Sequence, residues 1–274
     1  MMSQRRGAAL LSVAGLGALL CGCSGDSPSD VLHDTAANLS TIHSGRLSLR
    51  ITMSTRDGKD VGFAIDGPFS QTGAGGLPVL ALRYSRIDGT ATEVDTVVST
   101  GHAAYSVAGG RTYRLSSTQL ASLRQGGAAA GLGDLHPDRW LTDPRLSRGQ
   151  VGGVSTDRLT GRVQVLPLLE DLLSVLAGSG ANATSLSSSD ATTLQRAVSS
   201  AIVAIDTGHD DRLLRRLAVA VDLGHGSAPA GSALAGLDLV HLRLSLGLDA
   251  PNSPITVSAP RGADSAEQLT STSP

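Results

Sequence analysis

The chain has 274 residues, of which 41% are hydrophobic and 2% aromatic, and its formal charge is −2. The apolar fraction is high enough to build a core, so the composition excludes a disordered chain and predicts one globular domain. The charge is balanced and no cluster combines aromatic with basic residues, so we expect no nucleic acid partner.

The first 23 residues have the pattern of an export signal. Arg5 and Arg6 precede an apolar run from Gly7 to Leu20, and two closely spaced cysteines follow. A membrane-spanning helix needs about 20 apolar residues, which is more than this run provides. We therefore expect residues 1–22 to be a signal peptide that is removed.

The residues around the expected cleavage site indicate a lipid anchor. Leu20 at −3, Gly22 at −1 and Cys23 at +1 resemble the lipobox of bacterial lipoproteins, which makes Cys23 the acylated N-terminus. Cys21 is a poor alternative, because Leu20 would then occupy the −1 position, where a small side chain is needed. Acyl chains give stable attachment, so we expect a lipid-anchored protein on the extracytoplasmic face of the cell membrane, with residues 23–29 as a lipidated tether. The alternative is an ordinary secreted protein with a stray cysteine.

The first part of the domain predicts a helix and then a meander of strands. Apolar residues recur at helical spacing from Asp30 to Ile42, and the alternation over Arg46–Ser54 predicts a strand with one wet face. A turn over residues 56–59 leads to a second strand, which is expected to end at Gly67-Pro68. Three further strands are expected. Their candidate core-facing residues are Leu80, Leu82 and Tyr84 in the first, Val94, Thr96 and Val98 in the second, and Tyr105 and Val107 in the third.

The second part predicts more strands and an apolar helix. Residues 111–115 are expected as a short strand, 116–123 as a helix and 142–150 as a loop. A strand over 152–165 precedes a helix opened by Pro167, whose leucines form a stripe, and three strands follow over 202–206, 213–222 and 240–249, with a bulge near Leu239. The expected fold is therefore α+β: one large antiparallel sheet with helices, as a single domain over residues 30–260, before a loose tail over 261–274.

Motifs for catalysis and metal binding are missing. The seven histidines are scattered, and the sequence has neither a nucleophile elbow nor a phosphate loop. The acidic run Asp206–Asp211 does not fit a calcium loop and lies between two expected strands, so we expect a solvated turn there. We expect no enzyme activity, no metal and no cofactor.

Several motifs in order along the chain resemble one known family. They are Gly67–Phe69 (GPF), Leu77-Pro78, Arg139–Pro144 (RWLTDP) and Gly152–Val165 (GGVSTDRLTGRVQV) before the leucine helix. Together with the lipobox they resemble the LppX/LprA/LprF/LprG lipoproteins of actinobacteria, over about residues 30 to 260. The resemblance implies a strongly curved antiparallel sheet (a half-barrel) wrapped around helices, similar to LolA and LolB, which encloses an apolar cavity for lipid. The chain is most similar to an uncharacterised branch of this family.

Two hypotheses for function remain open. The first is a membrane-anchored carrier or chaperone that binds the acyl chains of a lipid or glycolipid and works with an envelope transporter that the sequence does not name. The second is a non-enzymatic binding or sensory module that contacts another envelope protein and keeps a filled core. The candidate cavity-lining residues are Leu47, Leu49, Ile51, Phe63, Ile65, Leu80, Leu82, Leu168, Leu172 and Leu176.

The lipid anchor is tested by replacing its acceptor. Cys23→Ala should release the protein from the membrane fraction or leave its precursor uncleaved, because the thiol is the acylation point. Cys21→Ala should remain processed and membrane-bound. Fractionation with mass spectrometry of the N-terminus measures both outcomes, and a processed, membrane-bound Cys23→Ala protein would show that the lipoprotein hypothesis is wrong.

Overall fold

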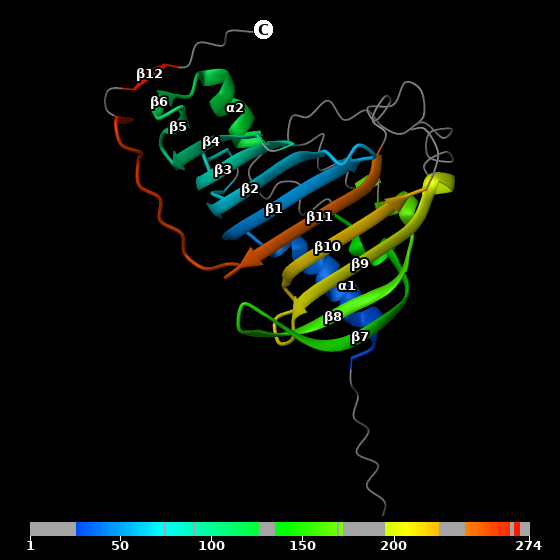
Figure 1. The fold of residues 1–274 in the computed structure, drawn as a ribbon. Helices are drawn as coiled ribbons and strands as arrows, with labels where there is room; N and C mark the ends of the chain where they lie inside the picture. The colour runs from blue at the N-terminus through cyan, green and yellow to red at the C-terminus, as the bar shows by residue number, and fades with distance from the viewer. Residues whose placement is uncertain are drawn as a thin grey trace, which may run out of the picture.

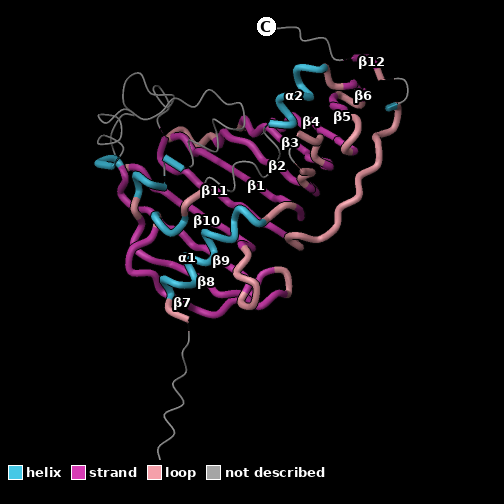
Figure 2. The backbone as a smooth tube through the Cα atoms, turned by 180° about the vertical axis from the view of Figure 1, so that it is seen from behind, coloured by secondary structure: helices cyan, strands magenta, loops and turns pink. Residues whose placement is uncertain are grey.

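The computed structural model describes residues 26–73, 75–89, 91–125, 135–168, 170–171, 195–224, 239–263 and 266–268. The chain forms a large sheet that curves around a helix, as Figures 1 and 2 show from opposite sides. The helices that lie wholly within the described residues include α1 (Pro28–Asn38) and α2 (Ser117–Gln125), with short 3-10 turns η1 (Leu39–Thr41) and η2 (Pro137–Arg139). The strands are β1 (Ser44–Thr55), β2 (Asp60–Ser70), β3 (Val79–Asp88), β4 (Ala91–Thr100), β5 (Ala104–Ala108), β6 (Arg111–Arg114), β7 (Leu141–Val151), β8 (Val154–Val163), β9 (Val198–Gly208), β10 (Leu214–Leu223), β11 (Leu239–Asp249) and β12 (Glu267–Gln268).

Two meanders are joined into one sheet by the pairing of β1 with β11. The strand order is β12-β6-β5-β4-β3-β2-β1-β11-β10-β9-β8-β7, and only β12 with β6 is parallel. The predicted fold class, a curved antiparallel sheet with few helices, is confirmed. β12 also shows that part of the expected C-terminal tail is hydrogen-bonded to the sheet, since Glu267 lies opposite Tyr113.

The core lies between α1 and the concave face of the sheet. Ser27 caps α1, because its side chain accepts a hydrogen bond from the backbone N–H of Asp30, and Pro28 occupies the first turn. Val31, Leu32 and Leu39 bury the inner side of this segment in the same cluster as the leucines and valines of β1, β8, β9, β10 and β11. The alternation of the strands thus turns one continuous apolar face toward the helix.

Gly67 lets β2 continue where the sequence suggested an end. Its φ is +147°, and a Cβ placed there would lie 2.0 Å from the backbone oxygen of Ala81 on β3. A glycine is therefore required for β2 and β3 to approach so closely. β2 accordingly runs through Gly67-Pro68 to Ser70, so the expected end at Gly67-Pro68 is wrong.

The prediction of a loop over residues 142–150 is also wrong, because these residues form most of β7. The segment is polar and contains Pro144, which are features of a loop. In the structure β7 is an edge strand, where proline is tolerated, and the ladder is interrupted between Thr142 and Arg145, with Asp143 at a φ of 51°. The bulge expected near Leu239 is found, since Ser54 pairs with His241 and Thr55 with Leu239.

The predicted inward residues are right for β3 and wrong for β4 and β5. Leu82 of β3 pairs with Val97, so Val94, Thr96 and Val98 lie on the opposite, convex side with Tyr105, which pairs with Val98. β4 carries valines on both faces, and period-two alternation does not fix the phase of such a strand.

The close approach at Gly67 gives a direct test. Gly67→Ala should destabilise the protein by about 3 kcal/mol or more, because the added methyl group meets backbone rather than a movable side chain. Gly58→Ala is the matched control: Gly58 also has a positive φ, +80°, but nothing lies within 4 Å of a Cβ there. Gly58→Ala should lower the free energy of unfolding by about 1–2 kcal/mol. Urea unfolding measures the stability of both variants. Equal losses of stability would contradict the requirement for a glycine where β2 and β3 approach closely.

Candidate functional site

The concave face of the sheet divides into a closed part and a more open part. Near α1 the side chains are fully covered: Leu159 and Ile205 are 0% exposed, and α1 packs against β7 and η2 at this end of the sheet. Farther along the sheet, over β1 to β4, several side chains on the same face are only partly covered, next to others that are buried. α1 lies behind β8 to β11 in Figure 1 and in front of them in Figure 2.

Six apolar side chains make up the half-buried apolar stretch. They are Leu49, Phe63, Ile65, Leu82, Tyr84 and Val97. Tyr84 is 40% exposed, and its ring stacks on that of Phe63 with 5.9 Å between the centroids. Large exposed apolar side chains that gather in one place usually mark a contact surface for a ligand or partner.

Strand register explains why these residues meet. Leu49 lies opposite Ile65, and Ile65 lies opposite Tyr84, so one apolar row crosses three strands. Asp95 follows Tyr84 in this row, and Arg86 lies opposite Phe63 in the next row. The apolar row therefore ends at β4 beside two charged residues, which gives the stretch a polar edge.

The structure divides the predicted cavity residues into three groups. Leu47, Ile51, Leu80 and Leu168 are buried in the core, at 0% to 8% exposure. Leu49, Phe63, Ile65 and Leu82 belong to the half-buried apolar stretch. Leu172 and Leu176 lie outside the described residues, as does the expected lipidation site Cys23.

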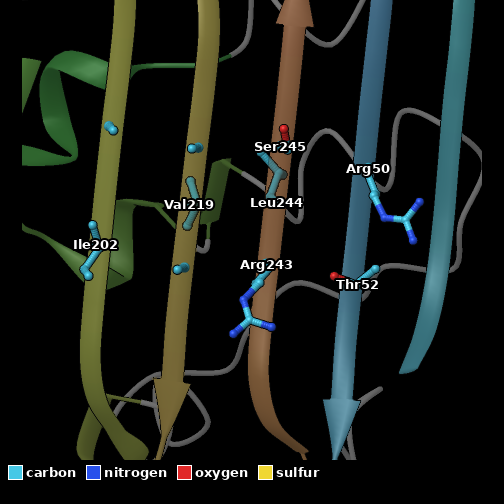
Figure 3. A pocket seen from close by; sticks show the side chains of 10 residues that line it. Arg50, Thr52, Ile202, Val219, Arg243, Leu244 and Ser245 are labelled. Carbon is cyan, nitrogen blue, oxygen red and sulfur yellow. The ribbon is translucent and has the colours of Figure 1, made fainter. Parts of the chain in front are cut away.

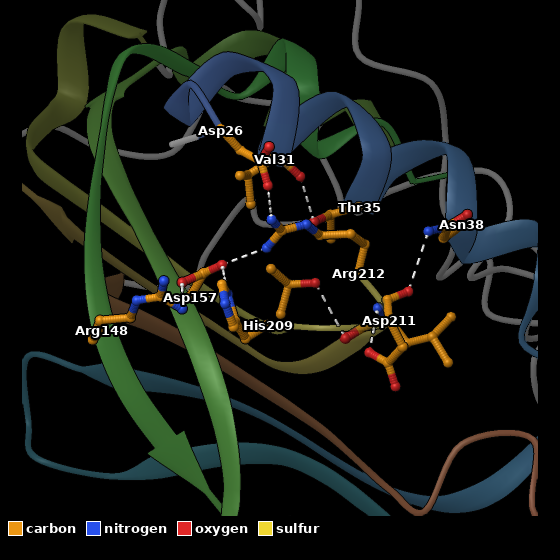
Figure 4. Close-up of polar contacts among 11 residues, drawn as sticks. Asp26, Val31, Thr35, Asn38, Arg148, Asp157, His209, Asp211 and Arg212 are labelled. Atoms are coloured by element: carbon orange, nitrogen blue, oxygen red, sulfur yellow. Dashed lines mark hydrogen bonds and ion pairs between the residues drawn. The ribbon is translucent and has the colours of Figure 1, made fainter. Parts of the chain in front are cut away.

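A cluster of charged side chains around Asp157 connects α1 to the sheet (Figure 4). Asp157 of β8 is 1% exposed, and its carboxylate contacts Arg148 at 3.0 Å and Nδ1 of His209 at 2.8 Å. Arg212 bridges Asp157 and Asp26, which lies just before α1. At the other end of α1 the Asn38 side chain donates to the carbonyl oxygen of Asp211. The hairpin between β9 and β10 thereby contacts both ends of α1.

The pKa of Asp157 is lowered by this cluster. Burial alone would raise it, but the hydrogen bonds from His209 and Arg212, together with the charge of Arg148, outweigh burial. The carboxylate is therefore held in its ionised form, as a buried charge requires.

A second anchor attaches the start of the apolar helix to the sheet. Residues 165–168 and 170–171 are helical, and Asp171 accepts hydrogen bonds from Nε1 of Trp140 at 2.8 Å and from the backbone N–H of His136 at 2.7 Å. Trp140 itself is 0% exposed. The RWLTDP segment thus has a structural role in holding this helix.

Sequence reasoning missed Asp157 and Asp171 as buried anchors, and it was wrong about Asp206. Asp157 shares the inward parity of Leu159, so an acidic residue in phase with the core of β8 was the available signal. Asp206, expected in a solvated turn, is 0% exposed because Arg158 and Arg216 cover it from both neighbouring strands, at 2.7 and 2.9 Å. The turn itself occupies residues 209–211.

The described residues contain no group of three or more His, Cys, Asp or Glu side chains placed to hold a metal ion. Within the same residues, no helix is long and apolar enough to cross a membrane.

No protein-family model matches the chain, and no curated protein matches its sequence. Among solved structures, LprF from Mycobacterium bovis is similar, with 11% identity and a TM-score of 0.46 over 85% of this chain and 96% of that chain. A DUF1329 family protein from Desulfovibrio piger matches with 11% identity and a TM-score of 0.22, over 83% and 95% of the two chains. A LolA superfamily protein from Nitrosomonas europaea matches with 10% identity and a TM-score of 0.20, over 84% and 96%.

The charged cluster predicts a specific pH dependence. Because the folded-state pKa of Asp157 is lowered, its contribution to stability is complete above the unfolded pKa of about 4 and is lost as the pH falls through the folded pKa. Asp157→Asn should destabilise the protein by about 3 kcal/mol near pH 7, since it leaves the largely buried Arg212 without this partner, and the difference from wild type should shrink toward pH 2.

The matched control is Asp143→Asn, which removes an exposed ion pair with Arg162 at 3.6 Å. Its effect should be below about 1 kcal/mol at any pH. Chemical denaturation over a pH series measures both variants. A pH-independent loss in Asp157→Asn would contradict the role given to the ionised carboxylate.

Proposed function

We propose that the protein binds the acyl chains of a lipid or acylated glycolipid on the concave face of its sheet and carries or chaperones that lipid at the cell envelope. The half-buried apolar stretch is the observation that supports this function. It offers apolar side chains that the core does not fully cover, while α1 and the Asp157 cluster cover the rest of the concave face near β7.

The energy available from such a surface fits this function. An acyl chain gains about 0.8 kcal/mol for each methylene that leaves water, so even part of a long chain gives useful affinity. Arg86 and Asp95, at the polar edge, lie where a polar head group would remain in water. The apolar composition of the stretch also fits recognition of chain length and shape better than recognition of a polar solute.

The anchoring of the protein belongs to the same proposal. Acylated Cys23 would hold the domain at the extracytoplasmic face of the membrane, close to lipid that it could receive or deliver. Asp26 lies only three residues after Cys23, so the ion pair of Asp26 with Arg212 would place the anchor near the β9–β10 hairpin. The domain over residues 30–260 would then be the single lipid-binding unit.

Leu82→Trp tests the binding surface. The indole should occupy space that acyl chains need, displace about two methylenes and weaken uptake of a fluorescent diacyl lipid about tenfold, while the delipidated protein keeps its thermal midpoint. Ser85→Trp, on the same strand but on the convex side, is the matched control and should bind lipid as wild type does.

If the interior is a filled core, the opposite result is expected for stability and for lipid uptake. Overpacking would then lower stability by about 1–3 kcal/mol in Leu82→Trp, and neither wild type nor variant would take up lipid. That result would favour the binding or sensory module over the lipid carrier.

A further inference from the structure

A hollow lies on the convex side of the sheet, away from α1. It has a volume of about 380 Å³ and is formed by β9, β10, β11 and β1 (Figure 3). Its lining residues are Arg50, Thr52, Ile202, Ala204, Ala218, Val219, Ala220, Arg243, Leu244 and Ser245. The proposed lipid-binding function makes no use of this surface.

Small side chains in two neighbouring rows make the hollow. One row runs from Ala204 through Ala218 and Ser245 to Arg50, and the next from Ile202 through Ala220 and Arg243 to Thr52. The three alanines leave a low apolar floor between larger neighbours. Ile202, at one edge of this floor, is 61% exposed, which is unusual for a large aliphatic side chain in the middle of a sheet.

Two arginines at the other edge, Arg50 and Arg243, form no ion pair among the described residues. Arg50 and Arg243 are both exposed, and no acidic side chain in the described part of the chain lies within 4 Å of either. The nearby Asp222 accepts instead from His241 at 2.7 Å, although the charge of Arg243 still helps to lower its pKa. Three other arginines on this face have acidic partners: Arg158 and Arg216 pair with Asp206, and Arg46 pairs with Asp66.

We propose that this hollow is a docking surface for a segment of a partner protein that presents carboxylates beside a large apolar side chain. The alanine floor and Ile202 accept the apolar side chain, and Arg50 and Arg243 complement the carboxylates. Arginines beside an apolar pocket are typical of the residues that dominate protein interfaces.

Other occupants fit less well. The hollow is open on one side and covers one face of its occupant, whereas small-molecule sites enclose most of the ligand surface. A membrane surface gives about 1 kcal/mol for each basic residue, so two arginines beside neutralised pairs contribute little. A twofold contact between two copies would place four of these arginines in one interface, and no acidic residue lines the hollow to offset their charge.

The test uses purified protein and defined labelled peptides. One peptide carries a tryptophan flanked by glutamates, and the comparison peptide has lysines in place of the glutamates. Fluorescence anisotropy should show binding of the acidic peptide only. The double variant with Arg50→Glu and Arg243→Glu should weaken it about tenfold or more, because like charges then meet. Ala218→Trp, which fills the floor, should weaken it similarly.

Arg83→Glu is the matched control, since Arg83 is an exposed arginine on the same face of the sheet. It should bind the acidic peptide as wild type does. The arginine substitutions are exposed, so thermal midpoints should stay unchanged and the result remains interpretable even if Ala218→Trp does not fold.

With the peptides, the proposal is overturned by no binding of the acidic peptide, by equal binding of both peptides, or by equal losses in the double variant and in Arg83→Glu. Binding to phosphatidylglycerol vesicles is measured in parallel. If the double variant loses vesicle binding and keeps peptide binding, the surface is a membrane contact and the proposal is wrong.

Discussion

The pairing of β1 with β11 is the constraint on which the rest of the structure depends. It joins residues about two hundred positions apart in sequence and converts two meanders into one sheet. The register of this pairing places apolar side chains opposite one another on one face. Leu47, Leu49 and Ile51 lie opposite Leu248, Leu246 and Leu244. A slip by one residue would turn one of these rows toward solvent, so burial fixes the register.

The apolar face that β1 and β11 share has two consequences for function. Next to β11 the sheet curls over α1, and the cluster of Asp157, His209 and Arg212 fixes the helix there, so the core is closed at this end. On the side of β2 to β4 the same apolar face continues without full cover, and this continuation is the surface to which we assign the acyl chains. Around its hollow the convex side carries small and charged residues beside the exposed Ile202, so this surface is chemically distinct.

Much of the fold could be predicted from local pattern, and the failures have physical causes. The strict alternation over Arg46–Ser54 identified β1 and the inward residues Leu47, Leu49 and Ile51. β4 was assigned the wrong phase because valines occur on both of its faces, and β7 was missed because an edge strand tolerates Pro144 and polar residues. The buried Asp157, Asp171 and Asp206 depend on partners from distant strands or segments, such as Arg212, Trp140 and Arg216, and local sequence contains no information about such pairs.

Native mass spectrometry of the protein purified from its own host tests the central claim most directly. A lipid-binding protein should carry a noncovalent species in addition to any covalent acyl anchor, and that species should dissociate on collisional activation with the mass of an acylated lipid. Leu82→Trp purified in the same way should carry less of it. A wild-type protein that shows only the mass of its processed chain and anchor would contradict the account and favour a binding module with a filled core.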